Sequence, residues 1–577
     1  MIGTLMLNYI DALIRISKGG ADDNPHSPGG ILSPILNKLY EINMGDLSAA
    51  MALQFQMSEG MNERWQVWWQ RQSELMSGAG YTDKEQLFSA PEWNNADAYT
   101  CIKDHYLYIS QLIENSVSLL QCQDETLNMR LKFFSRQFLS ALSPANFIFS
   151  NPEVAALTAK TQGENLIAGM NNLLEDARCS NEVLNVRQVS KTAFMPGKNL
   201  ATTPGDVVFR NEICEIIQYR PLTKMVEHTP LLIIPPLINK FYILDLSETK
   251  SMVRWLLEQG HCVFMLSWKN PDHSQQNTNF ENYVLNGVVK AVSVVESITG
   301  SDQVNAVGYC LGGTLLAASV AYYAARRMKK HIKSATYLAT IIDFSMPGEL
   351  EVFCDPQLIA VIDEQNRQRG YMDGRQLNVT FNLLRENTLY WNYYVDRYLK
   401  GKSLSSFDLL YWSSDSTNMT AACWYDIVQG FYLENRLVQP RSCKIGGVYI
   451  DITRVDIPAY FVATQEDHIA LWQGVYEGAR YFKEHATFVL GKSGHVAGII
   501  NPPAKGKYGY WENSQPSECP DQWLSNAHEH AGSWWEHWGR WLKATEKKEP
   551  VTAYATGNEL HPVLGAAPGE YVMEKLV

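Results

Sequence analysis

The sequence lacks the motifs that identify several classes of protein. Its ten cysteines include no CxxC pair, so neither a zinc site nor a thiol–disulfide motif is indicated. Neither GxxxxGK[ST] nor HExxH occurs, which removes the usual signals of a phosphate-binding loop and of a zinc protease. A net charge of −12 does not favour general nucleic-acid binding, which normally requires a basic surface. We therefore expect no metal, no cofactor and no nucleic-acid partner.

Long hydrophobic runs are also missing. No uninterrupted apolar stretch approaches the roughly 20 residues of a membrane span. Residues 1–17 lack a basic region and a small-residue cleavage site, so they resemble a short amphipathic helix and not a signal peptide. Together with cysteines scattered along the chain, these features predict a cytoplasmic protein with reduced thiols.

The pattern of apolar residues changes near residue 195. A chain of 577 residues is too long for one compact core. Before the break, apolar residues recur with helical spacing, for example in 51–69, 106–120 and 131–142. After a Pro- and Gly-containing stretch, short apolar runs alternate with helical segments. This predicts a mainly helical N-terminal domain at 1–195 and an α/β domain at 196–577.

Six short apolar runs in the second part are typical of a parallel sheet that is buried on both faces. They are 231–234, 263–266, 304–307, 337–340, 460–463 and 488–490. Between about 341 and 440 no clear strand pattern occurs, and aromatic residues are dense. We interpret this segment as a cap inserted between two strands, over the active site.

Cys310 is the candidate nucleophile. It lies in the motif GYCLGG, which follows the predicted strand 304–307 and opens a helix-like run at 314–327. Strand, sharp turn and helix are the setting of a nucleophile elbow, here with Cys in place of Ser. Flanking glycines permit the turn, and the helix N-terminus favours a thiolate. The alternative is a buried structural cysteine beside a Gly-rich helix start.

A nucleophile of this kind needs a base and a group that orients the base. Polar clusters follow the last two predicted strands, which places them at the same sheet edge as Cys310. The order nucleophile, acid, histidine favours Asp467 as the orienting acid and His495 as the base. Glu466 and His468 remain competitors for these roles.

Acyl transfer also needs N–H donors for the oxyanion. The N–H of Leu311, directly after the nucleophile, supplies one. The second is expected from the loop 235–240, with Leu237 as the first choice and Ile238 next. This loop could also be no more than a Pro-stiffened turn. Lys240 is interpreted as a surface lysine and not as a phosphate-binding residue.

The C-terminal part contains three further histidines and a group of tryptophans. His528, His530 and His537 are interpreted as partly exposed helical residues. Two tryptophan-rich stripes at helical spacing could bind an apolar surface, but core packing is the favoured reading. These stripes are Trp65, Trp68 and Trp69, and Trp534, Trp535, Trp538 and Trp541.

Several motifs together resemble the polyhydroxyalkanoate synthases, over about residues 90–577. They are GYCLGGT at 308–314, PPLINKFYILDL at 235–246, DSTN at 415–418, SGHVAGIINPP at 493–503, NPE at 151–153 and FFSRQFLSALSPAN, which ends at Asn146. An apolar residue after the nucleophile, and the chain length, are similar to class I members. One departure is Ser413, where many members carry Asn after the tryptophan.

The resemblance implies a function and a mechanism. Cys310 would carry the acyl group, His495 would be its base and Asp467 the third catalytic residue, either orienting the histidine or acting on the 3-hydroxyl. The enzyme would polymerise (R)-3-hydroxyacyl-CoA, with 3-hydroxybutyryl-CoA the expected short-chain substrate, and would release CoA without a cofactor. A homodimer at the surface of the polymer granule is implied. A cysteine thioesterase or esterase, or a non-catalytic granule-surface protein, are the alternatives.

Overall fold

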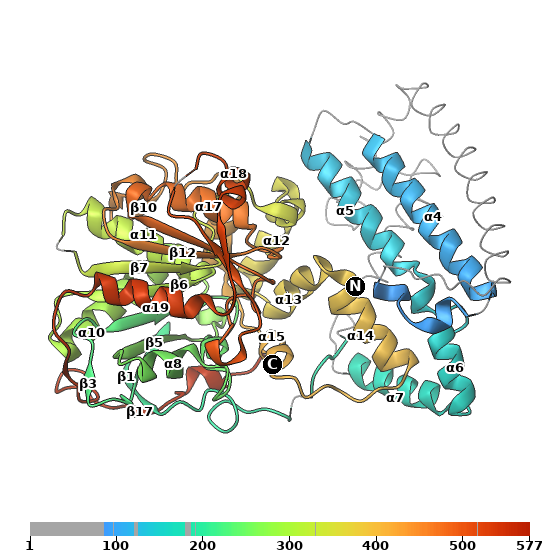
Figure 1. The fold of residues 1–577 in the computed structure, drawn as a ribbon, viewed down its shortest axis with the longest axis horizontal. Coiled ribbons are helices and arrows are strands. Elements are labelled where there is room, and N and C mark those ends of the chain that lie inside the picture. The colour runs from blue at the N-terminus through green and yellow to red at the C-terminus, as the bar shows by residue number, and fades with distance from the viewer. Residues whose placement is uncertain are drawn as a thin grey trace. The chain divides into compact units, whose positions relative to one another are not determined.

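The computed structural model describes residues 86–95, 97–119, 125–178, 186–190, 192–328, 330–515 and 517–576. The expected helices at 1–17 and 51–69, with the first tryptophan stripe, lie outside these residues. The chain divides into two compact units (Figure 1). The first comprises Met1–Gln188 and Thr380–Ser405, and the second Val189–Val379 and Ser406–Val577.

The described part of the first unit is helical, as the sequence predicts. Its helices are α4 (Asp97–Leu119), α5 (Glu125–Ala141), α6 (Pro152–Lys160), α7 (Glu164–Arg178) and the short α14 (Asn392–Tyr394). The start of α6 follows from its sequence, because the Asn151 side chain accepts a hydrogen bond from the N–H of Val154 and a proline occupies the first turn.

The segment 380–405 belongs by packing to the first unit, although it falls inside the predicted cap. Its anchor is the carboxylate of Asp176, whose side chain is fully buried. Arg397 donates to it through Nε and Nη2, at 2.6 and 2.9 Å, and the Tyr398 hydroxyl does so at 2.8 Å. Arg187 also pairs with this carboxylate. A buried carboxylate requires such partners, and they fix this segment against α7.

The second unit contains a mixed sheet of eleven strands in the order β15-β14-β13-β12-β7-β6-β4-β5-β2-β1-β17. The central six strands are parallel. They are β4 (Leu231–Ile234), β5 (Val263–Trp268), β6 (Val304–Tyr309), β7 (Ile332–Leu338), β12 (Ala459–Thr464) and β13 (Ala486–Gly491). All six predicted strands are confirmed, but the run at 337–340 overlaps only the last two residues of its strand, which spans Ile332–Leu338.

Antiparallel strands extend this sheet on both sides, which the sequence analysis did not anticipate. They are β1 (Gly205–Arg210), β2 (Cys214–Tyr219), β17 (Gly565–Ala566), β14 (Tyr510–Glu512) and β15 (His528–His530). Three two-residue pairs lie outside the sheet, formed by β3 (Met225–Val226) with β16 (Val551–Thr552), β10 (Lys444–Ile445) with β11 (Val448–Tyr449), and β8 (Tyr371–Met372) with β9 (Met419–Thr420). The last pair lies in the predicted cap, where no strand was expected.

Helices cover both faces of the sheet. Those that pack on it include α8 (Met252–Glu258), α10 (Lys290–Thr299), α11 (Leu311–Ala325), α17 (Trp472–Arg480) and α19 (Trp534–Thr545). The remaining helices are α9 (Phe280–Asn282), α12 (Pro356–Arg369), α15 (Asp408–Ser414), α16 (Ala421–Tyr425), α18 (Pro520–Ser525) and α13 (Gly374–Leu383), whose last residues belong to the first unit. Alternate residues of β4 enter opposite cores, since Leu232 packs with α10 and α11, and Leu231 with α8 and α19.

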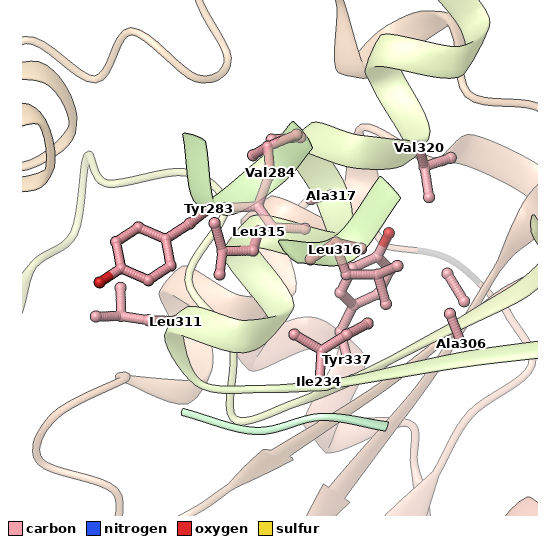
Figure 2. Packing of buried hydrophobic residues seen from close by; sticks show 14 of the residues in the cluster. Ile234, Tyr283, Val284, Ala306, Leu311, Leu315, Leu316, Ala317, Val320 and Tyr337 are labelled. Carbon is pink, nitrogen blue, oxygen red and sulfur yellow. The ribbon is translucent and has the colours of Figure 1, made fainter. Parts of the chain in front are cut away.

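Helix α11 is apolar on all sides because it is buried. Figure 2 shows Leu315 and Leu316 of this helix among Ile234 and Tyr337 of the sheet. The helix that follows the candidate nucleophile is therefore held firmly in the core. Across the described ranges, every helix is too short or too polar to cross a membrane.

Candidate active site

Cys310 lies in the turn between β6 and α11, as the sequence predicts. Its backbone has φ 53° and ψ −125°, a strained conformation for a residue with a side chain. The turn is held on both sides. The Cys310 N–H donates to the carbonyl of Leu338 at 2.9 Å, and its carbonyl accepts from the N–H groups of Gly313 and Thr314, at 2.9 and 3.2 Å. The side chain is thus placed at the carboxyl end of the parallel strands.

The glycines around Cys310 allow close backbone contacts. A Cβ at Gly312 would overlap the carbonyl oxygens of Ile234 and Pro235, and a Cβ at Gly308 would overlap Gly313. Glycine at 312 therefore lets the loop after β4 approach the start of α11. This contact brings the predicted oxyanion loop to the nucleophile.

Asp467 and His495 meet at the same edge of the sheet. They follow the adjacent parallel strands β12 and β13, in which Thr464 is paired with Gly491. His495 Nδ1 donates to Asp467 Oδ2 at 2.7 Å. The other carboxylate oxygen accepts from the N–H groups of Ile469 and Ala470, at 2.8 and 2.9 Å. The Asp467 side chain is fully buried, so these bonds fix its orientation.

The side chain of His495 is influenced by Cys310 as well as by its contact with Asp467. Burial alone would lower the pKa of this imidazole. The carboxylate of Asp467 and the contribution of Cys310 outweigh burial and raise the pKa of His495 to about 10. The imidazolium form of His495 is therefore favoured at neutral pH, which places a positive charge beside Cys310.

Of the competing residues, Glu466 is exposed and donates its backbone N–H to Ser493. The partly buried His468 follows Asp467 in the same loop. The carboxylate that contacts His495 is therefore the one that the sequence analysis favoured. The interpretation of His528 and His530 as helical is wrong, because both lie in strand β15. Pairing with β14 overrides the apparent helical spacing.

His537 does lie in a helix, α19. Its ring hydrogen-bonds the Tyr460 hydroxyl at 2.7 Å and pairs with Glu512 at 2.7 Å. In the same helix Trp534 and Trp535 are fully buried and donate their indole N–H groups to the carbonyls of Gly498 and Ile499, at 3.0 and 2.9 Å. The packing role predicted for this stripe is confirmed, and it supports the loop that follows His495.

Tyr309 is a site residue that the sequence analysis missed. Its ring stacks on His495, with ring centroids 5.6 Å apart, and its hydroxyl donates to the His495 carbonyl at 2.9 Å. It holds the histidine from the strand that carries the nucleophile. The only signal was its place beside Cys310, and nothing in the sequence connects it with a residue 186 positions away.

The two predicted oxyanion donors, Leu311 and Leu237, belong to the two segments that approach each other at Gly312. Leu311 is the first residue of α11, where backbone N–H groups have no acceptor within the helix. Leu237 and Leu311 are buried in one hydrophobic cluster, and Ile238 and Cys310 pack against it. The Gly312 contact places the start of the loop after β4 beside the start of α11, and the role of the Leu311 and Leu237 N–H groups stays a prediction.

The interpretation of Lys240 as a surface lysine is wrong. Its side chain is 4% exposed, and Nζ donates to Asp415 Oδ1 at 2.9 Å and to the Glu574 carbonyl at 2.5 Å. Both partners lie far along the chain, so the burial of Lys240 could not be predicted from the residues around it. Within the ranges that the structure describes, no group of three or more His, Cys, Asp or Glu could hold a metal ion.

Comparisons with known proteins agree with this geometry. Residues 84–256 match the family described as the N-terminus of poly-beta-hydroxybutyrate polymerase (PhaC). Residues 229–502 match the alpha/beta hydrolase fold, which confirms the fold predicted from the sequence.

Curated relatives match over most of the chain. A poly(3-hydroxyalkanoate) polymerase of Methylorubrum extorquens is 42% identical over 86% of this chain and 81% of its own. The poly(3-hydroxyalkanoate) polymerase subunit PhaC of Rhizobium etli is 39% identical over 94% of this chain and 86% of its own. The corresponding subunit of Cupriavidus necator is 37% identical over 88% and 86%. The chain therefore belongs to the poly(3-hydroxyalkanoate) polymerase family.

Proposed function

We propose that this enzyme polymerises (R)-3-hydroxyacyl-CoA of short chain length, with 3-hydroxybutyryl-CoA as substrate, into polyhydroxyalkanoate through an acyl–Cys310 intermediate. Family membership supports the reaction class. The observation that carries the mechanism is the strained Cys310 beside the His495–Asp467 pair. A strained nucleophile with an oriented base is what covalent acyl transfer requires.

Acylation of the enzyme begins with the Cys310 proton on His495. The thiolate attacks the thioester carbonyl, and the N–H groups of Leu311 and Leu237 bind the resulting oxyanion. The C–S bond to CoA then breaks, and His495 returns its proton to the CoA thiolate. The product is free CoA and a new thioester on Cys310, which keeps the acyl group activated.

Chain extension uses a hydroxyl group as the next nucleophile. His495 takes the proton of the 3-hydroxyl of another unit, the alkoxide attacks the acyl thioester, and the Cys310 thiolate leaves as the ester forms. We assign Asp467 to orienting His495. Both of its oxygens are already occupied, by the imidazole and by two backbone N–H groups, and its side chain is buried away from an incoming hydroxyl.

We further propose that the enzyme needs no cofactor, acts as a homodimer and associates with the polymer granule in the cytoplasm. A thioester substrate carries its own activation, so a cofactor has no step to serve. Exposed apolar side chains of the first unit fit an apolar polymer surface, among them Phe149, which is 91% exposed, and Ile167, Met170 and Leu174 on α7.

The test is incubation of the purified protein with 3-hydroxybutyryl-CoA, following CoA release and turbidity together. Cys310→Ala is the inactive variant, and Cys519→Ala, which changes an exposed cysteine, is its matched control. Release of CoA with growing polymer, lost only in Cys310→Ala, is the expected result. CoA release with free 3-hydroxybutyrate alone would make the protein a thioesterase. Release that persists in Cys310→Ala would refute the cysteine mechanism.

A further inference from the structure

A buried ion cluster lies beneath the loop 235–240. Its centre is the carboxylate of Asp415, whose side chain is 6% exposed. Lys240 Nζ donates to one oxygen at 2.9 Å, and the Tyr242 hydroxyl and Lys575 Nζ approach the other, each at 2.9 Å. Taking charged groups out of water is costly, so a cluster this complete calls for an explanation.

The residues after Asp415 are bonded directly to the same loop. Ser416 pairs with Asn239 in an antiparallel bridge. The Thr417 N–H donates to the carbonyl of Ile238 at 3.0 Å, and its hydroxyl lies 3.0 Å from the carbonyl of Leu237 and 2.7 Å from that of Ile238. Leu237 is the proposed second oxyanion donor, and its carbonyl oxygen therefore accepts a hydrogen bond from Thr417, which follows Asp415 in the chain.

The end of the chain closes the cluster. Lys575 contacts Asp415 and donates to the Tyr411 hydroxyl at 2.9 Å, while the Glu574 carbonyl accepts from Lys240. The tail is itself anchored, because the carboxylate of Glu215 accepts the N–H groups of Glu570 and Tyr571. Segments near residues 240, 415 and 575 therefore lock one another in place.

We propose that Asp415 is a positioning residue of the acyl-transfer site, acting with Lys240 and the C-terminal Lys575 to hold loop 235–240 so that the Leu237 N–H meets the oxyanion. This inference rests on the proposed function. It assigns no contact with substrate to Asp415. A donor that is moved by a fraction of an ångström loses much of its effect on the transition state, whereas the thiolate of Cys310 is formed elsewhere, by His495 and Asp467.

This separation gives a direct experiment on the full-length protein. Asp415→Asn keeps the shape of the side chain and removes its charge. Asp408→Asn is the matched control, because Asp408 begins helix α15, which Asp415 follows directly, and its recorded ion pair is with Lys250, at 2.6 Å, and not with loop 235–240. Two rates are measured for each protein: single-turnover release of CoA from 3-hydroxybutyryl-CoA, and alkylation of Cys310 by iodoacetamide, read by mass spectrometry of its peptide.

Alkylation forms no oxyanion, so only the first rate should change. We expect Asp415→Asn to lower the acylation rate about 10- to 100-fold, with KM changed less than about threefold and alkylation within about twofold of the unmodified protein. Asp408→Asn should match the unmodified protein in both. An acylation rate in Asp415→Asn equal to that of the control would overturn the proposal. So would alkylation that falls in parallel with acylation, because the damage would then be general.

Lys575→Met provides a second test that leaves the buried Lys240–Asp415 pair intact. Its side chain is half exposed, so folding should be little affected. We expect Lys575→Met to lower the acylation rate by a smaller factor, about three- to tenfold, and Lys575→Arg to restore the rate. Equal rates in Lys575→Met and the unmodified protein would show that the C-terminal segment has no part in positioning the loop. If the unmodified protein itself forms no polymer, it is the proposed function that fails, and not this inference.

Discussion

Replacing Asp467 with Asn should uncouple Cys310 from its base. The amide keeps the size of the carboxylate, but it removes the charge that raises the pKa of His495 to about 10. Burial, which lowers that pKa, is then opposed only by the contribution of Cys310, so the pKa falls toward its ordinary 6.5. A fall from 10 to 6.5 corresponds to roughly 5 kcal/mol in the protonation free energy of His495, and at pH 7.5 it lowers the imidazolium population from nearly complete to about a tenth. The same change in serine-protease triads lowers kcat about 10⁴-fold.

The assay measures CoA release at pH 7.5 and the pH profile of Cys310 alkylation by iodoacetamide. In the unmodified protein the imidazolium of His495 persists until the pH rises through about 10, so the charge beside Cys310 is constant and alkylation should change little between pH 6 and 9. In Asp467→Asn we expect a 10³- to 10⁴-fold lower kcat, and an alkylation rate that varies with pH over this range because His495 loses its charge there. Glu466→Gln, which changes the exposed neighbour, is the control and should stay within about twofold. An Asp467→Asn enzyme that keeps a tenth of the activity and the flat profile would refute the reasoning.

Three further changes can be predicted. Tyr309→Phe keeps the ring stacked on His495 but loses the hydroxyl bond to its carbonyl, so kcat should fall about three- to tenfold and stability by about 1 kcal/mol, measured by urea unfolding. Gly312→Ala forces a Cβ into backbone oxygens and should abolish CoA release, while Gly494→Ala, whose Cβ would meet nothing closer than 3.6 Å, should not; equal activity would contradict the packing argument. Burial lowers the pKa of His261 to about 4, so the unfolded chain binds a proton between pH 6.5 and 4 that the fold excludes, and stability falls as the pH drops. His261→Leu should reduce that loss by roughly 2 kcal/mol at pH 5 relative to pH 7, measured by urea unfolding.

Sequence patterns predicted the central sheet because its strands are short, apolar and bounded by turns. Runs such as 231–234 and 304–307 can be little else than buried strands, and the glycines around Cys310 leave few alternatives to a sharp turn. The antiparallel edges were missed because strands such as β15, with the sequence HEH, have no apolar pattern and exist through pairing with β14.

The candidate site, like the sheet, could be predicted only in part from the sequence. That polar residues after the last two parallel strands lie at the edge of Cys310 follows from topology, and the sequence therefore led to Asp467 and His495. The choice between Asp467 and Glu466 rests on which carboxylate is turned inward, and the 2.7 Å contact with His495 shows this only in the fold.

By itself, the sequence determined the α/β-hydrolase core and the helical character of the described N-terminal residues, and it predicted Cys310 and His495 for the site, with Asp467 favoured over Glu466. These features depend on local residue patterns and on the order of the helices and strands, both of which can be read from the sequence. Only the tertiary structure decided that Tyr309 supports His495, that residues 380–405 pack with the first unit, and that Lys240, Asp415 and Lys575 form one buried cluster. Such contacts join residues up to about 330 positions apart, and their partners are chosen by burial and charge balance in the folded chain.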